Sequence, residues 1–130
     1  MKNLSIFILL IFLDLISKYI IKNNLSLNQN IELNSFLGLV YIQNYGVSFG
    51  LLSGIVSHWL LIFIGITIVI FVFYLMIVSK KRIERLAFFI IIVGAISNIL
   101  DRTINTYVVD FILFHYKTFY WPAFNLADIY

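Results

Sequence analysis

The stretch from Trp59 to Val78, WLLIFIGITIVIFVFYLMIV, decides the fold class because it contains no charged residue. A helix that crosses a bilayer needs about 20 predominantly apolar residues, and this run is long enough. The rest of the chain agrees: of its 130 residues 62% are hydrophobic and 12% are charged, and the mean hydropathy is +1.02. Soluble domains are about 45–50% apolar and about 25% charged, so the sequence predicts a membrane protein.

Two further apolar runs flank this segment and predict spanning helices over residues 4–21 and 86–104. The short link between the second and third spans is crowded with basic residues: Lys80, Lys81, Arg82 and Arg85. Basic residues in short loops mark the cytoplasmic side of a membrane. We therefore expect a cytoplasmic N-terminus and external segments at residues 22–58 and 105–130.

The external segments are expected to form a small β element. Leu39–Ile42 is a short β-branched and aromatic run, followed by the turn-forming residues Asn44-Tyr45-Gly46. Val108–Phe114 is a second run of this kind, and it could pair with the first. The prediction is an all-α polytopic membrane protein with a small extracytoplasmic β element, folded as one membrane-embedded domain over residues 1–130.

Composition argues against several kinds of site. The chain has no cysteine, so disulfides and thiolate metal sites are excluded. No long basic run carries interleaved aromatic residues, which leaves nucleic-acid binding without support. His58 and His115 lack a metal-ligand spacing, and the order of residues suggests no Ser-His-Asp arrangement. We expect neither a metal nor a cofactor.

Two aspartates, Asp110 and Asp128, lie 18 positions apart in apolar surroundings, within VVDFI and WPAFNLAD. An ionisable group near hydrocarbon is costly, so it indicates function. Both are predicted on the external face, where two adjacent carboxylates could share a proton and activate water. Each also has a plainer explanation: Asp110 as a solvated strand residue, and Asp128 as an acid that complements a helix N-terminus. Asn125 could orient Asp128 if this stretch is helical.

Polar residues inside the first and third predicted spans form two further groups. Asp14 and Lys18 lie on one helix face, either as active-site support or as a pair whose lysine reaches the outer surface. In the third span Asn98 lies about one turn from Asp101 and Arg102, and we expect Arg102 to pair with Asp101 and keep it ionised. Small residues before this group favour close helix packing: Gly94, Ala95 and Ser97.

Taken in order, these motifs resemble bacterial lipoprotein signal peptidase, also called signal peptidase II, over nearly the whole chain. The matching motifs are Asp14/Lys18, Asn44-x-Gly46-x-x-Phe49-Gly50, Asn98-x-x-Asp101-Arg102, Val109-Asp110-Phe111 and Phe124-Asn125-x-Ala127-Asp128. The resemblance implies an aspartic endopeptidase of the bacterial cytoplasmic (inner) membrane, with its active site at the outer face. It would remove signal peptides from prolipoproteins by cleaving before the diacylglyceryl-modified cysteine, in contact with membrane lipids.

The resemblance also implies roles for single residues. The catalytic aspartates would be Asp110 and Asp128. Supporting or substrate-binding positions would be Asp14, Lys18, Asn44, Gly46, Asn98, Asp101, Arg102, Asn125 and Ala127.

The sequence departs from the family pattern at three places. The stretch Val93–Asn98 has fewer glycines, and Leu15 stands where the family has glutamine. The chain stops at Tyr130, where the family continues into a fourth spanning helix, so we expect a C-terminally truncated member with three of four helices. Two alternatives stay open: an inactive truncated fragment, and a small cation-binding carrier built around Asp14 in mid-span.

Overall fold

The computed structural model describes residues 2–46 and 56–130, and the motif residues Phe49 and Gly50 lie outside these ranges. It contains three long helices: α1 (Lys2–Asn24), α2 (His58–Val78) and α3 (Arg82–Asn105). All three are long and apolar enough to cross a membrane, as the hydropathy of the sequence predicts. Four strands accompany them: β1 (Asn30–Glu32), β2 (Leu37–Asn44), β3 (Val108–Tyr116) and β4 (Phe119–Tyr120).

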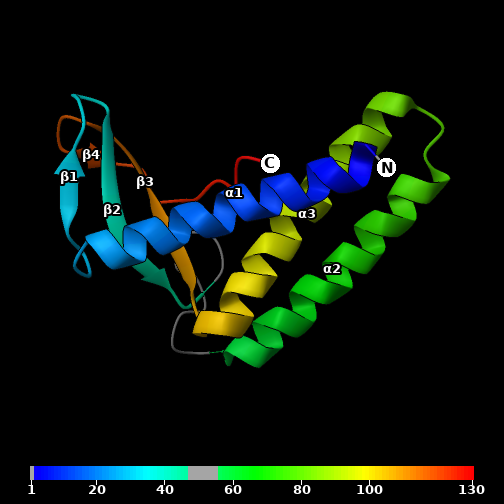
Figure 1. Cartoon of the computed structure of the whole chain (residues 1–130), viewed down its shortest axis with the longest axis horizontal. Helices are drawn as coiled ribbons and strands as arrows, with labels where there is room; N and C mark the ends of the chain where they lie inside the picture. The colour runs from blue at the N-terminus through cyan, green and yellow to red at the C-terminus, as the bar shows by residue number, and fades with distance from the viewer. Residues whose placement is uncertain (1, 47–55) are drawn as a thin grey trace.

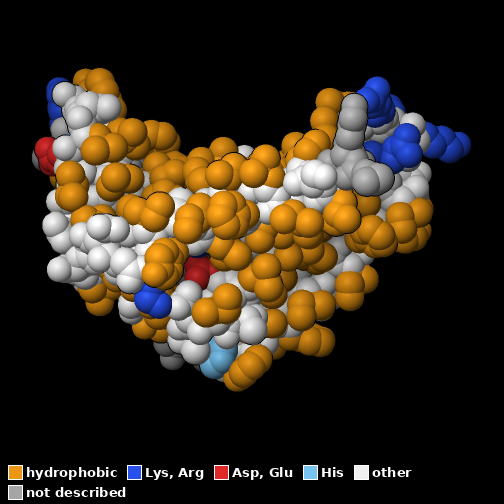
Figure 2. Space-filling model, in the orientation of Figure 1, with side chains coloured by type: hydrophobic (Ala, Val, Ile, Leu, Met, Phe, Trp, Pro, Cys, Tyr) orange, Lys and Arg blue, Asp and Glu red, His pale blue; other side chains and the backbone are white. Residues whose placement is uncertain are grey.

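The helices expose their apolar side chains, which is typical of a surface that faces lipid. In α2 Phe63 is 66% exposed and Ile70 is 64% exposed. The helix begins after Ser57, whose side-chain oxygen accepts a hydrogen bond from the Leu60 backbone N–H at 3.3 Å. Figure 2 shows hydrophobic side chains over much of the molecule, and Lys and Arg side chains gathered at one end, where α2 turns into α3.

The strands form one antiparallel sheet in the order β1-β2-β3-β4. Figure 1 shows the sheet at one end of the helices, with the N-terminus and the α2–α3 connection at the other end. The two predicted strands, Leu39–Ile42 and Val108–Phe114, are both present and pair directly within β2 and β3. The sequence pattern does not predict β1 or β4, which are only three and two residues long.

The end of α3 sets the position of β3. Thr106 follows Asn105 with a left-handed conformation (φ 69°), and its N–H bonds to the Arg102 carbonyl at 2.8 Å. β-branched residues rarely adopt that conformation. This turn sends the chain directly into β3, where the Val109 N–H donates to the Asp101 carboxylate at 2.8 Å. The strand is therefore fastened to the last turn of the helix before it.

The two faces of β3 have different tasks, because successive side chains of a strand point to opposite faces. One face packs into a core with the end of α1 and with β2; this core consists of Ile21, Leu25, Tyr41, Tyr107, Val109 and Phe111. The other face carries Asp110, which stands opposite Ile42 of β2. The core thus fixes the strand and leaves Asp110 free to serve a site.

Candidate active site

Asp110 is a buried carboxylate that accepts two amide N–H bonds. Asn44 Nδ2 donates to Oδ2 at 2.9 Å, and Asn125 Nδ2 donates to Oδ1 at 2.7 Å. The Gly46 N–H occupies the side-chain oxygen of Asn44, which fixes the orientation of that amide. Asp110 is only 4% exposed, and this burial raises its pKa from 3.8 to about 6, against the Asn44 hydrogen bond and with help from the charge of Asp128.

Asp128 lies exposed in a turn, and the helix that could have carried it is absent from residues 121–130. Phe124 forms a bridge with Ile112 of β3, which holds the chain extended just before the turn. Asn98 Nδ2 donates to Asp128 Oδ1 at 2.9 Å, and the Asn125 backbone N–H donates to Oδ2 at 3.1 Å. Within residues 121–130, Asp128 thus takes its hydrogen bonds from the side chain of Asn98 and the backbone of Asn125.

Asn125 is the residue that contacts both aspartates. It is fully buried, and it gives its side-chain N–H to Asp110 and its backbone N–H to Asp128. Its side-chain oxygen accepts the Asp128 N–H at 3.2 Å, so its amide cannot turn over without losing a bond. The turn brings Asn125 and Asp128 together by the local side-chain-to-backbone bonds that asparagine favours.

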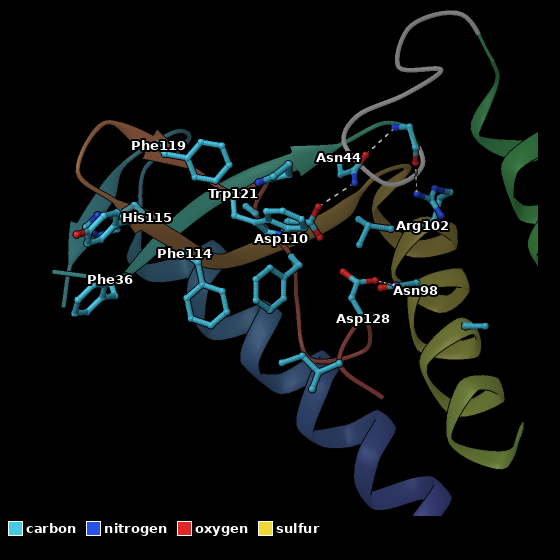
Figure 3. A pocket seen from close by; sticks show the side chains of 18 of the residues that line it. Phe36, Asn44, Asn98, Arg102, Asp110, Phe114, His115, Phe119, Trp121 and Asp128 are labelled. Atoms are coloured by element: carbon cyan, nitrogen blue, oxygen red, sulfur yellow. Dashed lines mark hydrogen bonds between the residues drawn. The ribbon is translucent and has the colours of Figure 1, made fainter. Parts of the chain in front are cut away.

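The two aspartates line one pocket of about 1150 Å³ whose two ends differ in chemistry. The polar end is formed by Asn44, Asn98, Arg102, Asp110 and Asp128, and the aromatic end by Phe36, Phe114, Phe119 and Trp121. Figure 3 shows both ends, with the aspartates facing the pocket from different elements. Pockets of about 300–1,000 Å³ hold drug-sized ligands, so this one has room for a short peptide segment. In the described residues no three His, Cys, Asp or Glu side chains gather as metal ligands.

The aromatic end of the pocket is the part that the sequence analysis missed. Phe114 and Tyr116 follow Asp110 on β3 at even spacing, which places all three on the same face of the strand. This even spacing along the strand could have predicted the aromatic wall from the sequence. Phe36 stacks on Tyr116 with ring centroids 5.8 Å apart, and so extends this wall onto the loop before β2.

Lys18 stays inside the protein. It is 2% exposed, and its Nζ lies 2.7 Å from Asp14 Oδ2, 2.7 Å from Asn98 Oδ1 and 3.5 Å from Asp101 Oδ2. The alternative in which this lysine reaches the outer surface is therefore wrong, because three internal acceptors match its three N–H donors. Lys22, one turn further along α1, is exposed, in contrast to Lys18.

Asp101 and Arg102 do not pair with each other, contrary to the expectation from the sequence. Successive residues of an α-helix point about 100° apart, so neighbours face different partners. Asp101 faces Lys18 and accepts the Val109 N–H, whereas Arg102 Nη2 donates to the Gly46 carbonyl at 2.7 Å. Arg102 thereby holds the end of β2 beside the polar end of the pocket.

Asp14 binds the turn that follows β4. Its Oδ1 accepts the Ala127 N–H at 2.9 Å, and its Oδ2 accepts the Ser97 hydroxyl at 2.6 Å. Gly94 permits this approach, because a Cβ there would collide with the Ala127 carbonyl oxygen. The sequence predicts Gly94 and Ser97 on a packing surface but not these contacts with Asp14 and Ala127. Gly94, Ser97 and Asp101 lie at i, i+3 and i+7, so their spacing could have predicted that all three share one helix face.

Comparison with known proteins decides the family. A sequence model described as signal peptidase (SPase) II matches residues 6–130. The chain belongs to the signal peptidase II family. It is therefore a protease of the signal-peptidase type, and its three apolar helices make it a multi-pass membrane protein.

Relatives in this family cover almost the whole chain. The lipoprotein signal peptidase of Thermodesulfovibrio yellowstonii is 40% identical over 126 residues, which are 97% of this chain and 83% of the relative. That of Francisella tularensis subsp. novicida is 35% identical over 133 residues, covering 98% of this chain and 83% of the relative.

Two solved structures, each of a bacterial membrane enzyme obtained by the in meso method, share the fold. The one at 2.3 Å resolution superposes with a TM-score of 0.85 at 28% identity, covering 98% of this chain and 79% of that chain. The one at 1.9 Å resolution gives a TM-score of 0.79 at 29% identity, covering 98% and 83%. Membership in the signal peptidase II family is thus matched by a likeness in structure along nearly the whole chain.

Proposed function

We propose that this chain removes signal peptides from prolipoproteins as an aspartic endopeptidase, cleaving before the diacylglyceryl-modified cysteine, with Asp110 and Asp128 as the catalytic pair. The observation that carries the proposal is that Asn125 donates to both carboxylates beside one pocket. Two carboxylates held together in this way can share one proton, as an aspartic dyad does. The substrate class follows from the family. The mechanism uses no metal ion and no cofactor.

The two aspartates take different roles in the resting site. Each accepts two N–H bonds, so hydrogen bonding does not distinguish them. Burial does: Asp110 is buried with its pKa raised to about 6, whereas Asp128 is exposed to the pocket. We therefore assign the shared proton to Asp110, because burial disfavours its charged form, and the role of base to Asp128.

Cleavage then proceeds in two proton-balanced steps. Asp128 takes a proton from water as the water oxygen attacks the scissile carbonyl carbon, and Asp110 donates its proton to the carbonyl oxygen. In the resulting diol, Asp110 takes back a hydroxyl proton while Asp128 gives its proton to the amide nitrogen. The C–N bond breaks, the signal peptide leaves with a new carboxyl group, and the lipid-modified cysteine keeps a free amine. Both aspartates return to their starting states.

The proposed location is the bacterial cytoplasmic (inner) membrane, with the N-terminus inside and the dyad at the outer face. The basic residues of the α2–α3 connection and of the first turn of α3 support this orientation: Lys80, Lys81, Arg82 and Arg85. Their end of the helices is opposite the end that carries the sheet (Figures 1 and 2). A lipid-anchored substrate then keeps its acyl chains among membrane lipids while its cleavage site enters the pocket.

The alternative of a cation carrier is less well supported. It needs a carboxylate in mid-span that is open to a water-filled path. Asp14 is instead fully buried, and its two oxygens bond to Ala127, Ser97 and Lys18.

The test is prolipoprotein processing in bacteria depleted of their own signal peptidase II, read as a shift on a gel. We expect the chain to restore the processed form. Asp110→Asn and Asp128→Asn should each abolish it, because each removes a proton-transfer group. Glu32→Gln removes an exposed carboxylate on β1, outside the described lining of the pocket, and should process normally.

Two results would overturn the proposal. Processing by either Asp→Asn variant would remove the dyad from the mechanism. No processing by the unaltered chain, with its presence in the membrane verified by immunoblot, would favour the inactive form instead.

A further inference from the structure

Lys18 connects to Asp128 through a single side chain. Its Nζ donates to Asn98 Oδ1 at 2.7 Å, and Asn98 Nδ2 donates to Asp128 Oδ1 at 2.9 Å. An amide whose oxygen accepts from an ammonium group must turn its NH2 group the other way. Lys18 therefore fixes which end of Asn98 meets the aspartate. With the amide reversed, two oxygen atoms would face each other and repel.

The ammonium group of Lys18 is fully used inside the protein. Besides Asn98, it faces the carboxylates of Asp14 and Asp101, and its side chain is buried. The described lining of the pocket includes Asn98 and Asp128 but neither Lys18 nor Asp14. The lysine thus has no spare donor for a substrate, and any effect on catalysis must pass through its neighbours.

A second connection runs from the same pair to the backbone beside Asp128. Asp14 Oδ1 accepts the N–H of Ala127, the residue just before Asp128, at 2.9 Å. The Ser97 hydroxyl holds the other oxygen of Asp14 at 2.6 Å. The Asp14–Lys18 pair therefore acts on Asp128 in two ways: on its carboxylate through Asn98, and on the backbone next to it through Ala127.

We propose that the Asp14–Lys18 pair is a positioning device for Asp128: Lys18 orients the carboxylate through Asn98, and Asp14 places the backbone through Ala127. This inference rests on the proposed function, because it assigns the pair to the base of the dyad. A buried ion pair is by itself weak evidence for stability, since desolvation of both charges offsets their attraction. Catalytic groups need positioning within about 0.5 Å, which gives the pair a reason to be there.

A double-mutant cycle with Lys18→Met and Asn98→Leu tests whether Lys18 acts through Asn98. Purified protein in lipid vesicles would cleave a diacylglyceryl-modified prolipoprotein, and kcat and KM would be measured separately. Losing a hydrogen bond to a charged group corresponds to a fall in kcat of about 10- to 100-fold for each single variant, with KM within about twofold. When Asn98 is already leucine, adding Lys18→Met should lower kcat further by less than about threefold.

A matched control lies one turn along the same helix. Lys22 also donates to an asparagine of α3, to Asn105 Oδ1 at 2.6 Å, and Asn105 Nδ2 donates to Asp101 Oδ1 at 2.7 Å. In the described part of the chain no hydrogen bond joins Asn105 to Asp128. Because these contacts end at Asp101 and not at Asp128, Lys22→Met should lower kcat far less than Lys18→Met does. If Lys18→Met unfolds the protein, Asp14→Asn/Lys18→Met replaces it, because the double variant leaves one buried carboxylate without the lysine instead of two. That carboxylate, Asp101, still accepts hydrogen bonds from Val109 and Asn105. Adding Asn98→Leu to this double variant should again lower kcat by less than about threefold.

Losses that multiply in the double variant, or a rise in KM at unchanged kcat, would overturn the positioning role. The failure of the proposed function looks different. If Asp128→Asn cleaves in the same vesicles, the dyad itself is wrong. If Asp128→Asn is inactive and the losses still multiply, only the positioning inference fails.

Discussion

Asp110 carries a raised pKa, and this must appear as a pH dependence of stability. The quantity to follow is the difference in unfolding free energy between the unaltered protein and Asp110→Asn. We expect this difference to fall as pH rises from about 4 to about 7. Burial raises the pKa of Asp110 from 3.8 to about 6. Between these values the folded protein keeps a proton that the unfolded chain releases, so rising pH favours unfolding. At about 1.4 kcal/mol per pH unit, the total fall is about 3 kcal/mol.

The asparagine variant does not disturb this reasoning. Its amide meets N–H donors from Asn44 and Asn125, so one of its own N–H groups faces a donor and lowers stability. That loss is the same at every pH and shifts the whole difference curve by a constant. Asp110→Ala should give a parallel curve with a different offset.

The assay is equilibrium unfolding in mixed micelles, with sodium dodecyl sulfate as the denaturant and circular dichroism as the readout. Unfolding free energies would be measured at steps of one pH unit from about 4 to about 8. The difference should decline mostly between about 4 and 6 and level off above about 7. A difference that is flat, or that increases with pH, would refute the assignment of the shared proton to Asp110.

Two pairs of substitutions test other parts of the structure. Gly94→Ala should lower the cleavage rate about 100-fold per folded molecule, because its Cβ collides with the Ala127 carbonyl. The matched variant Gly65→Ala meets the Ile99 side chain at 3.1 Å and no backbone atom, so its cleavage rate should stay within about twofold. Equal rates in the two variants would contradict the close approach. Phe111→Ala in the core should lower the unfolding free energy by about 3–5 kcal/mol. Phe114 is 48% exposed beside the pocket, so Phe114→Ala should change the unfolding free energy by less than about 1 kcal/mol and raise KM instead. A large loss of stability in Phe114→Ala would argue against the position of Phe114 in the pocket wall.

Hydropathy and β-branched runs were sufficient to predict the main elements. The span Trp59–Val78 lies within α2, and the runs Leu39–Ile42 and Val108–Phe114 lie within β2 and β3. These predictions succeed because they depend on local properties, namely apolar length and the residue types that suit a strand. β1 and β4 are too short to carry such a pattern, since pairing with a neighbour creates them.

Partners within the site were harder to predict, because they depend on which way each helix face turns. Adjacency in sequence suggested an Asp101–Arg102 pair, but the helix separates these two side chains by about 100°. The true partner of Asp101 is Lys18 of another helix. Nothing near Asp14 in the sequence points to Ala127, because that contact joins residues 113 positions apart. Proximity of this kind is a product of tertiary packing.

The distance in sequence between Asp14 and Ala127 has a consequence for how the protein is made. At about 5–20 residues per second, a ribosome needs roughly 6 to 23 s to add the 113 residues that follow Asp14 up to and including Ala127. During that time α1 must reside in the bilayer with its aspartate lacking the backbone N–H that it later binds. Lys18, four residues away in the same helix, is available from the start to neutralise it. The ion pair within α1 therefore offsets the charge of this aspartate before its later partner Ala127 has been made.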